Sequence, residues 1–206
     1  MLVDDHAVVR MGFRLLLDAT EDMEVVAEAE SGEVAYARYS EVSPDVVVMD
    51  LAMPGAGGIE AVKRIVARDR NARVLALSAR EDTSHPKRVL KAGALGYLSK
   101  RSAPETLIDA VRETAAGRMY LDAAIAQRIA TQNINGEQNP VEILSEREFE
   151  VFIQLARGTS VNQIAAALKL SPSTVGTHLY NIKQKLGVAN QAEITLIAVH
   201  GGLIET

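Results

Sequence analysis

The sequence predicts two domains of different class: an N-terminal α/β domain with a five-stranded parallel, doubly wound sheet, and a C-terminal all-α domain of four helices. Strand and helix patterns alternate over residues 1–117, whereas only helix patterns occur over residues 142–206. Between them, residues 118–141 hold one short helix pattern, Ala123–Thr131, and a polar stretch, Gln132–Pro140, and are predicted to be a linker. A length of 206 residues suits two modest domains.

Five short apolar segments are the predicted strands. The third, Asp45–Asp50, is apolar on both faces, as expected of a strand that is buried from both sides. The other four are Leu2–Val3, Val25–Ala27, Arg73–Ser78 and Gly96–Ser99. A helix pattern follows each strand, and Pro104 opens the last of these helices at a position that tolerates proline. This alternation predicts a parallel, flavodoxin-like sheet covered by helices.

The C-terminal helices are marked by capping residues. Four starts are visible, namely Ser145-x-x-Glu148, Ser160-x-x-Gln163, Ser171-Pro172 and Asn190-x-x-Glu193. Gly158 and Gly187 are predicted stops. These signals place helices over residues 146–157, 161–169, 172–186 and 191–200.

Composition excludes several classes of protein. The chain has no cysteine, so disulfides, cysteine-based zinc sites and thiol catalysis are excluded. It has no apolar run of membrane-spanning length and no signal-peptide pattern, so we expect a cytoplasmic protein without membrane contact. The net charge is −5, yet Thr159–Ala192 contains three lysines and no acidic residue. This stretch is either a basic surface for a polyanion or a chance gap in acidic residues.

Polar side chains gather at the predicted carboxyl ends of the strands, where open parallel sheets bind their ligands. They are Asp4 and Asp5, Asp50, Ser78 and Lys100. Three carboxylates form a hard oxygen site suited to Mg²⁺, a lysine and a serine can contact phosphoryl oxygens, and aspartate can accept a phosphoryl group. The alternative is that these acids cap the helices that follow, which suits one aspartate better than the whole group.

Motifs in both halves resemble a known family. Val3-Asp4-Asp5-His6, Asp50-Leu51-Ala52-Met53-Pro54-Gly55 and Lys91-Ala92-Gly93-Ala94-x-Gly96-Tyr97-Leu98-x-Lys100 resemble the receiver domains of two-component response regulators. Leu144-Ser145-x-Arg147-Glu148, Gln163-Ile164-Ala165, Ser171-Pro172-Ser173-Thr174-Val175 and Lys185-Leu186-Gly187-Val188 resemble the LuxR-type helix-turn-helix domain. Together the motifs are similar to the NarL/FixJ group across nearly the whole chain.

The resemblance implies a role for each residue of the rim. Asp50 would accept phosphate from a sensor histidine kinase, and Lys100 would pair with the phosphoryl group. Asp4, Asp5, Asp50 and the backbone carbonyl of Ala52 would hold Mg²⁺. Ser78 and Tyr97 would be the switch pair that moves when phosphate arrives, although Tyr97 also suits a core position. The phosphorylated chain would then form a homodimer on double-stranded promoter DNA and regulate transcription.

Two further features of the sequence bear on these expectations. Family members usually have several residues before the acidic pair, whereas only three precede it here, so we expect a less firmly anchored first strand. The histidines His6, His85, His178 and His200 show no metal-ligand spacing and are interpreted as structural or surface residues. His6 follows the acidic pair, and we assign it no catalytic role.

The helix over residues 172–186 has the pattern of a recognition helix. Val175, Leu179, Ile182 and Leu186 form its apolar stripe. Its opposite face carries hydroxyl, amide and basic groups suited to phosphates and base edges, which with Lys169 are the predicted DNA contacts: Ser173, Thr174, Gly176, Thr177, Tyr180, Asn181, Lys183, Gln184 and Lys185. The family often has basic residues in place of Gly176 and Tyr180, so we expect altered base preference and modest affinity. Three lysines per protomer predict a salt slope near −5 for a dimer.

The last helix is the candidate dimer face, through Ile194, Ile197 and Ala198, although these residues suit the core equally well.

Three other functions stay open. An aspartate-based phosphatase of the haloacid-dehalogenase kind needs a second aspartate at the position of Ala52, so slow turnover is expected. A DNA-binding protein whose receiver ignores phosphate is the second. A ligand-sensing quorum regulator would share the C-terminal domain but not the acidic cluster.

Overall fold

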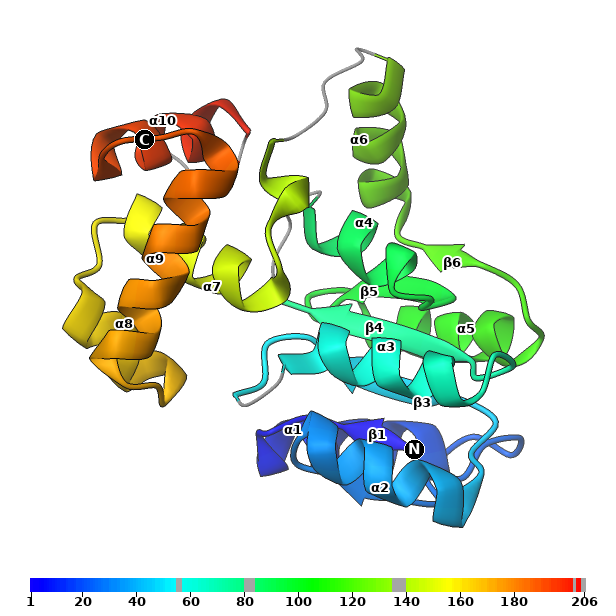
Figure 1. Cartoon of the computed structure of the whole chain (residues 1–206). Helices are drawn as coiled ribbons and strands as arrows, with labels where there is room; N and C mark the ends of the chain where they lie inside the picture. The colour runs from blue at the N-terminus through cyan, green and yellow to red at the C-terminus, as the bar shows by residue number, and fades with distance from the viewer. Residues whose placement is uncertain (55–56, 80–83, 135–139, 202, 205–206) are drawn as a thin grey trace. The chain divides into compact units, whose positions relative to one another are not determined.

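The structure is a computed structural model, and our description covers residues 1–54, 57–79, 84–134, 140–201 and 203–204. These residues form two compact units, Met1–Ala130 and Thr131–Thr206 (Figure 1). The limits predicted from sequence, at residues 117 and 142, stay predictions. Within the described ranges, no helix combines the length and apolar character that a membrane crossing requires.

A six-stranded parallel sheet forms the centre of the N-terminal unit, with strand order β2-β1-β3-β4-β5-β6. The strands are β1 Leu2–Val3, β2 Glu28–Ala29, β3 Val47–Asp50, β4 Val74–Ser78, β5 Gly96–Ser99 and β6 Tyr120–Leu121. The order confirms the doubly wound, flavodoxin-like class. It also places the ends of β1, β3, β4 and β5 side by side.

Helices cover both faces of the sheet. They are α1 Ala7–Asp18, α2 Gly32–Val42, α3 Gly57–Arg68, α4 Ser84–Lys91, α5 Pro104–Ala115 and α6 Ala123–Ile134. Alternate strand residues face opposite sides, so that Leu75 packs with α1 and α5 whereas Ala76 packs with α2, α3 and α4. These two apolar layers bury the strands on both faces and hold their carboxyl ends in place.

Two strands differ from the sequence-based prediction. The second strand is displaced from Val25–Ala27 to β2, because the Val25 N–H donates to Asp18 Oδ1 at 2.7 Å and Val26 is 50% exposed. The sixth strand, β6, lies in the predicted linker and pairs with β5. Its two residues are too few for a periodic pattern. Residues 132–134 of the predicted polar linker continue α6, and 135–139 lie outside the described residues.

The C-terminal unit contains the four predicted helices, preceded by a 3₁₀ turn, η1 Pro140–Ile143. The helices are α7 Glu146–Ala156, α8 Val161–Leu168, α9 Pro172–Leu186 and α10 Gln191–His200. Each begins after its expected cap, and Ser145 and Ser160 form complete capping boxes. Gly187 ends α9 with φ 67°, a left-handed conformation that favours glycine. The unit has its own core, which includes Phe149 and Phe152.

Candidate functional site

The predicted polar residues meet at one edge of the sheet. Asp4 follows β1, Asp50 and Ser78 are the last residues of β3 and β4, and Lys100 follows β5. Parallel strands that lie next to each other bring these ends together. Asp4, Asp50 and Ser78 are almost fully buried, at 2%, 1% and 1% exposure.

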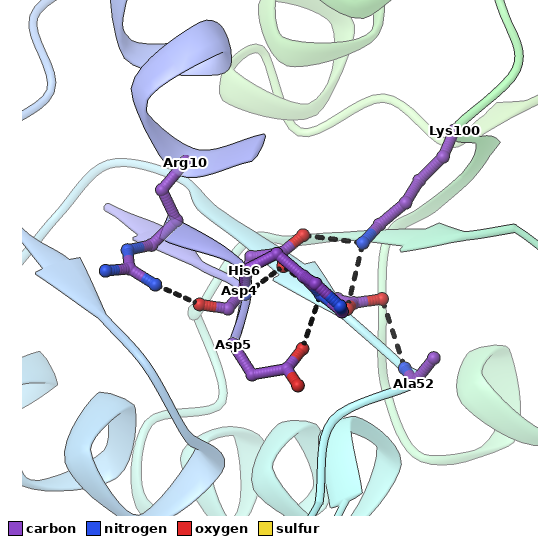
Figure 2. A network of polar contacts seen from close by, with 7 residues as sticks. Asp4, Asp5, His6, Arg10, Ala52 and Lys100 are labelled. Atoms are coloured by element: carbon purple, nitrogen blue, oxygen red, sulfur yellow. Dashed lines mark hydrogen bonds and ion pairs between the residues drawn. The ribbon is translucent and has the colours of Figure 1, made fainter. Parts of the chain in front are cut away.

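Lys100 joins two of the carboxylates. Its Nζ lies 2.5 Å from Asp4 Oδ2 and 2.9 Å from Asp50 Oδ2 (Figure 2). The N–H of Ala52 donates to Asp50 Oδ1 at 3.1 Å. Asp4, Asp50 and Lys100 therefore converge as expected, since residues 96 positions apart in the chain are in direct contact.

Burial and charge set the protonation of this pair. Burial raises the pKa of Asp50, and Lys100 and the Ala52 N–H oppose that rise. Burial lowers the pKa of Lys100, but its contacts with Asp4 and Asp50 outweigh that effect and leave the pKa raised. The ammonium therefore stays protonated, and its charge lowers the pKa of the Asp50 carboxyl against the effect of burial.

Asp4 and Asp5 are held by the start of α1. The His6 N–H donates to Asp4 Oδ1 at 2.8 Å, and Arg10 Nη1 donates to the Asp4 carbonyl at 2.6 Å. The His6 ring also lies here, with Nδ1 3.0 Å from Asp5 Oδ1. Sequence spacing did not indicate this position for the ring.

The carboxylates suit a hard divalent cation. Asp4, Asp5, His6 and Asp50 each offer a donor atom, and these atoms lie within 4.8 Å of one another. Asp5 Oδ1 and Asp50 Oδ2 are buried and accept no hydrogen bond of good geometry, although each has an ion-pair neighbour. Carboxylate oxygens with free acceptor capacity are the groups that Mg²⁺ coordinates. The role of the Ala52 carbonyl as a ligand stays a prediction.

Ser78 and Tyr97 lie on neighbouring strands of the same sheet. The register pairs Ala76 with Tyr97 and Ser78 with Ser99. Tyr97 is fully buried and packs in the core that α2, α3 and α4 cover. The tyrosine therefore occupies a core position in this structure, and its movement with Ser78 stays a prediction.

The predicted DNA contacts lie on the accessible side of α9. Six of those on α9 are exposed, namely Ser173, Thr174, Thr177, Tyr180, Gln184 and Lys185, whereas Gly176, Asn181 and Lys183 are half-buried. On the other side, Val175 and Ile182 are fully buried in the core. The helix is thus amphipathic, as its sequence pattern indicates.

The lysines of this surface differ in their surroundings. Lys169 is exposed and caps α8 with φ 54°. Lys183 Nζ donates to the Ala189 carbonyl at 2.9 Å, and Lys185 Nζ lies 2.5 Å from Glu148 Oε2. Glu148 is only 4% exposed and also accepts the Ser145 N–H at 2.7 Å. Sequence analysis found Glu148 as a capping residue but missed its pairing with Lys185.

The predicted dimer face needs correction. Ile194 and Ala198 are fully buried and belong to the core of the C-terminal unit, and Ile197 packs against it. This is the alternative that the sequence left open. The large apolar residue of α10 that is exposed is Leu196, at 55% exposure.

Comparison with known proteins agrees with both halves of this description. Residues 1–112 match the family described as "Response regulator receiver domain", and residues 142–198 match "Bacterial regulatory proteins, luxR family". The chain is 38% identical over 205 residues to response regulator UvrY of Escherichia coli (strain K12), covering 98% of this chain and 94% of the relative. It is 36% identical over 207 residues to response regulator GacA of Pseudomonas aeruginosa, covering 100% and 97%.

Solved structures give the same result. One is RcsB from Salmonella enterica serovar Typhimurium, "bound to promoter rprA in the presence of phosphomimetic BeF3-", with a TM-score of 0.65 and 25% identity over 95% of each chain. Another is response regulator ChrA of a heme-sensing two-component system, with a TM-score of 0.53 and 38% identity over 99% of this chain and 97% of that one. The rim of acidic residues with its lysine, the capped helices and these matches together show that the chain belongs to the NarL/FixJ group of response regulators, in which a receiver domain is joined to a LuxR-type DNA-binding domain.

Proposed function

We propose that a sensor histidine kinase phosphorylates this response regulator on Asp50, and that phosphorylation controls its binding to promoter DNA in the cytoplasm. The observation that carries the proposal is the contact of Lys100 with Asp4 and Asp50 at the buried edge of the sheet. A carboxyl group beside a protonated lysine, at the end of a central strand, is placed to act as a nucleophile toward phosphorus once ionised.

The transfer forms one bond and breaks one. An Asp50 carboxylate oxygen attacks phosphorus, an O–P bond forms, and the P–N bond to the donor imidazole breaks. The product carries roughly −1.5 to −2 charge, so the nearby donors must be rearranged around it. Lys100 Nζ lies 2.9 Å from Asp50 Oδ2 and can follow the phosphoryl oxygens without leaving the site.

Ser78 is the proposed partner of a second phosphoryl oxygen. It ends β4, directly beside the strand that carries Asp50, and it is 1% exposed. Movement of its hydroxyl toward the phosphoryl group would make room for Tyr97 to change position. Such a local charge event biases a two-state element, and a shift from 1:99 to 99:1 requires about 5.5 kcal/mol of differential binding.

Asp4, Asp5, Asp50 and the Ala52 carbonyl are the residues that we propose to hold Mg²⁺. Support for this proposal comes from Asp5 Oδ1 and Asp50 Oδ2, which are buried carboxylate oxygens without a well-aligned hydrogen-bond donor. When bound, the ion supplies positive charge that offsets the repulsion between the carboxylates and the incoming phosphoryl group.

The C-terminal unit is proposed to read DNA through α9. The exposed hydroxyl and amide groups of this helix suit phosphates and base edges, and Tyr180, at 63% exposure, offers a ring for contact. Relatives in complex with DNA support this proposal, since RcsB is described bound to a promoter.

Dimerisation is proposed to use the side of α10 that faces away from the core. Leu196 is 55% exposed and Ala192, one turn before it, is also exposed. A second copy of the chain is the proposed occupant, as RcsB is described as "two RcsB dimers bound to two parallel DNAs". Two protomers would place two α9 helices on two half-sites of the promoter.

The phosphoacceptor is tested by labelling with radioactive acetyl phosphate. We expect Asp50→Asn to abolish labelling, because the amide is not a nucleophile of this kind. Asp45→Asn is the matched control, since Asp45 is exposed just before β3 begins and should not alter labelling. Labelling that persists in Asp50→Asn would show that another residue is the acceptor.

DNA recognition and its control are tested together by selecting bound sequences from random DNA, with and without phosphorylation. We expect a defined sequence to be enriched and the enrichment to rise on phosphorylation. Enrichment that does not depend on phosphorylation or on beryllofluoride would favour a receiver that does not respond to phosphate.

We expect no enzymatic turnover beyond self-phosphorylation and slow autodephosphorylation. Ala52 occupies the position at which a haloacid-dehalogenase phosphatase needs a second aspartate, and an alanine cannot donate or accept a proton. Multiple-turnover release of phosphate from acetyl phosphate, at a rate far above decay of the labelled protein, would instead indicate an enzyme.

A further inference from the structure

His6 lies over the acidic cluster and has no part in the phosphoryl chemistry described above. Its Nδ1 is 3.0 Å from Asp5 Oδ1 and 3.3 Å from Asp4 Oδ1 (Figure 2). The side chain is 68% exposed, so the far edge of the ring reaches solvent. One ring nitrogen therefore faces the carboxylates while the other stays accessible to water.

The backbone holds the ring in this place. His6 is the N-cap residue of α1, its N–H donates to Asp4 Oδ1, and its carbonyl accepts the Arg10 N–H at 3.1 Å. Its side chain makes no hydrogen bond to the first turn of the helix, although capping is the usual role of a polar residue at this position. The ring nitrogen is thus available to the cluster instead of to α1.

The distances suit one shared ion. Two ligand atoms at about 2.0–2.2 Å from one divalent ion lie at most about 4.4 Å apart, and His6 Nδ1 lies 3.0 Å from Asp5 Oδ1 and 3.3 Å from Asp4 Oδ1. With Asp50 included, the four donor atoms lie within 4.8 Å of one another, so a small movement of one side chain brings all four into range of one ion. Independently, Asp50 Oδ2 is buried and accepts no hydrogen bond of good geometry, with the Lys100 ammonium 2.9 Å away.

The contact between the His6 ring and Asp5 is compatible with a hydrogen on Nδ1. In the tautomer that carries its hydrogen there, Nδ1 faces the Asp5 carboxylate at 3.0 Å as a donor. A cation that binds Nδ1 replaces this hydrogen. The exposed Nε2 can then carry the ring proton and donate it to water, as the second nitrogen of a metal-bound histidine usually does.

We propose that His6 Nδ1 is a ligand of the divalent cation at this site and shifts its preference from Mg²⁺ toward ions that favour nitrogen, such as Co²⁺. The inference rests on the proposed metal site of Asp4, Asp5 and Asp50. Carboxylates alone suit Mg²⁺, whereas imidazole suits the later first-row metals, which bind a mixed nitrogen and oxygen site more tightly.

The test compares the full chain with His6→Ala and with the control His200→Ala, which removes an exposed histidine from the C-terminal unit. Calorimetric titration should show that His6→Ala weakens Co²⁺ binding about tenfold or more and Mg²⁺ binding less than about threefold. With Mn²⁺ as a spin probe, pulsed electron paramagnetic resonance should detect a directly bound ¹⁴N in the full chain and in His200→Ala, but not in His6→Ala.

Three outcomes distinguish this inference from the proposed function. An unchanged ratio of Co²⁺ to Mg²⁺ affinity in His6→Ala, or a ¹⁴N signal that survives the substitution, would overturn the role of His6. If Mg²⁺ binding and Asp50 labelling then persist, the proposed function stands without it. If Asp50→Asn leaves binding of both ions unchanged, the cluster is not the metal site and both proposals fail there.

Discussion

Replacing Lys185 by methionine tests whether this lysine stabilises the DNA-binding unit or contacts DNA. Its Nζ lies 2.5 Å from Oε2 of Glu148, a carboxylate that is 4% exposed. The methionine keeps the apolar stem of the side chain and removes only the charge. The substitution therefore leaves a buried carboxylate whose remaining partner at Oε2 is the Ser145 N–H.

The expected loss of unfolding free energy follows from how far Lys185 and Glu148 are each buried. Removal of one partner of a fully buried pair costs roughly 3–5 kcal/mol. The Lys185 side chain is 40% exposed, so water can replace part of the lost contact, and we expect about 1–3 kcal/mol. Hydrogen exchange of the α7 and α9 amides measures this loss within the C-terminal unit, whatever the stability of the receiver.

The same pair predicts a dependence on acid. Burial raises the pKa of Glu148, but Lys185 and the Ser145 N–H outweigh it and hold the pKa below its ordinary value of 4.5. The folded state therefore binds this proton more weakly than the unfolded chain does. Its stabilisation is complete above pH 4.5 and is lost as pH falls through the lower folded value. Glu148→Gln keeps the capping box and should reduce this acid sensitivity.

The salt dependence of DNA binding can contradict this structural role of Lys185. If Lys185 stays paired with Glu148 on DNA, the salt slope of Lys185→Met equals that of the natural chain, whereas loss of the exposed Lys169 reduces it by about two in a dimer. A slope that falls by about two in Lys185→Met, with hydrogen exchange unchanged, would refute the structural role and restore the lysine as a phosphate contact.

Three further predictions concern other parts of the chain. Leu196→Glu should prevent dimer formation in beryllofluoride while the unit stays folded, whereas Ile194→Glu should unfold it; sedimentation and circular dichroism distinguish the two. Burial and the hydrogen bond to Asp69 raise the pKa of Tyr39 to about 12. The stability that the protonated tyrosine contributes should therefore be complete below pH 10 and lost between about pH 10 and 12. Tyr39→Phe should remove this pH dependence from alkaline unfolding curves. Gly58→Ala would place a methyl group 2.1 Å from a β3 carbonyl oxygen, so we expect a loss of about 1–3 kcal/mol in urea unfolding and slower labelling; unchanged stability would show that α3 can move away.

Local signals predicted most of the helical domain. The limits of α9 and α10 agree with those expected from sequence, because the capping residues Ser171 and Asn190 act on backbone groups only two or three residues away. The predicted position of β2 was wrong and β6 was not predicted, because a strand of two residues is defined by its partner in the sheet. No pattern within the segment itself contains that information.

Contacts between distant residues explain the rest. The α10 helix is apolar on several sides, so its period cannot indicate which side packs inward, and Ile194 and Ala198 were assigned to a dimer face as readily as to the core. The pairing of Lys185 with Glu148 joins residues 37 positions apart, and both had another interpretation from sequence. In the receiver, alternation of strands and helices did predict the convergence of Asp4, Asp50 and Lys100, because the parallel topology itself brings their ends together.

The charges at this edge explain why phosphorylation should change the structure. The Lys100 ammonium already bridges two carboxylates, those of Asp4 and Asp50, and Asp5 lies next to Asp4 in the chain. A phosphoryl group on Asp50 adds charge that Lys100 must meet, so its bond to Asp4 has to weaken as its bond to the phosphoryl oxygens forms. Asp4 is buried and cannot turn to water, and it then depends on the cation, the His6 N–H and its neighbours for compensation. We infer that metal and phosphoryl group stabilise each other's binding, because the cation compensates the charge of Asp4 when phosphorylation weakens its contact with Lys100.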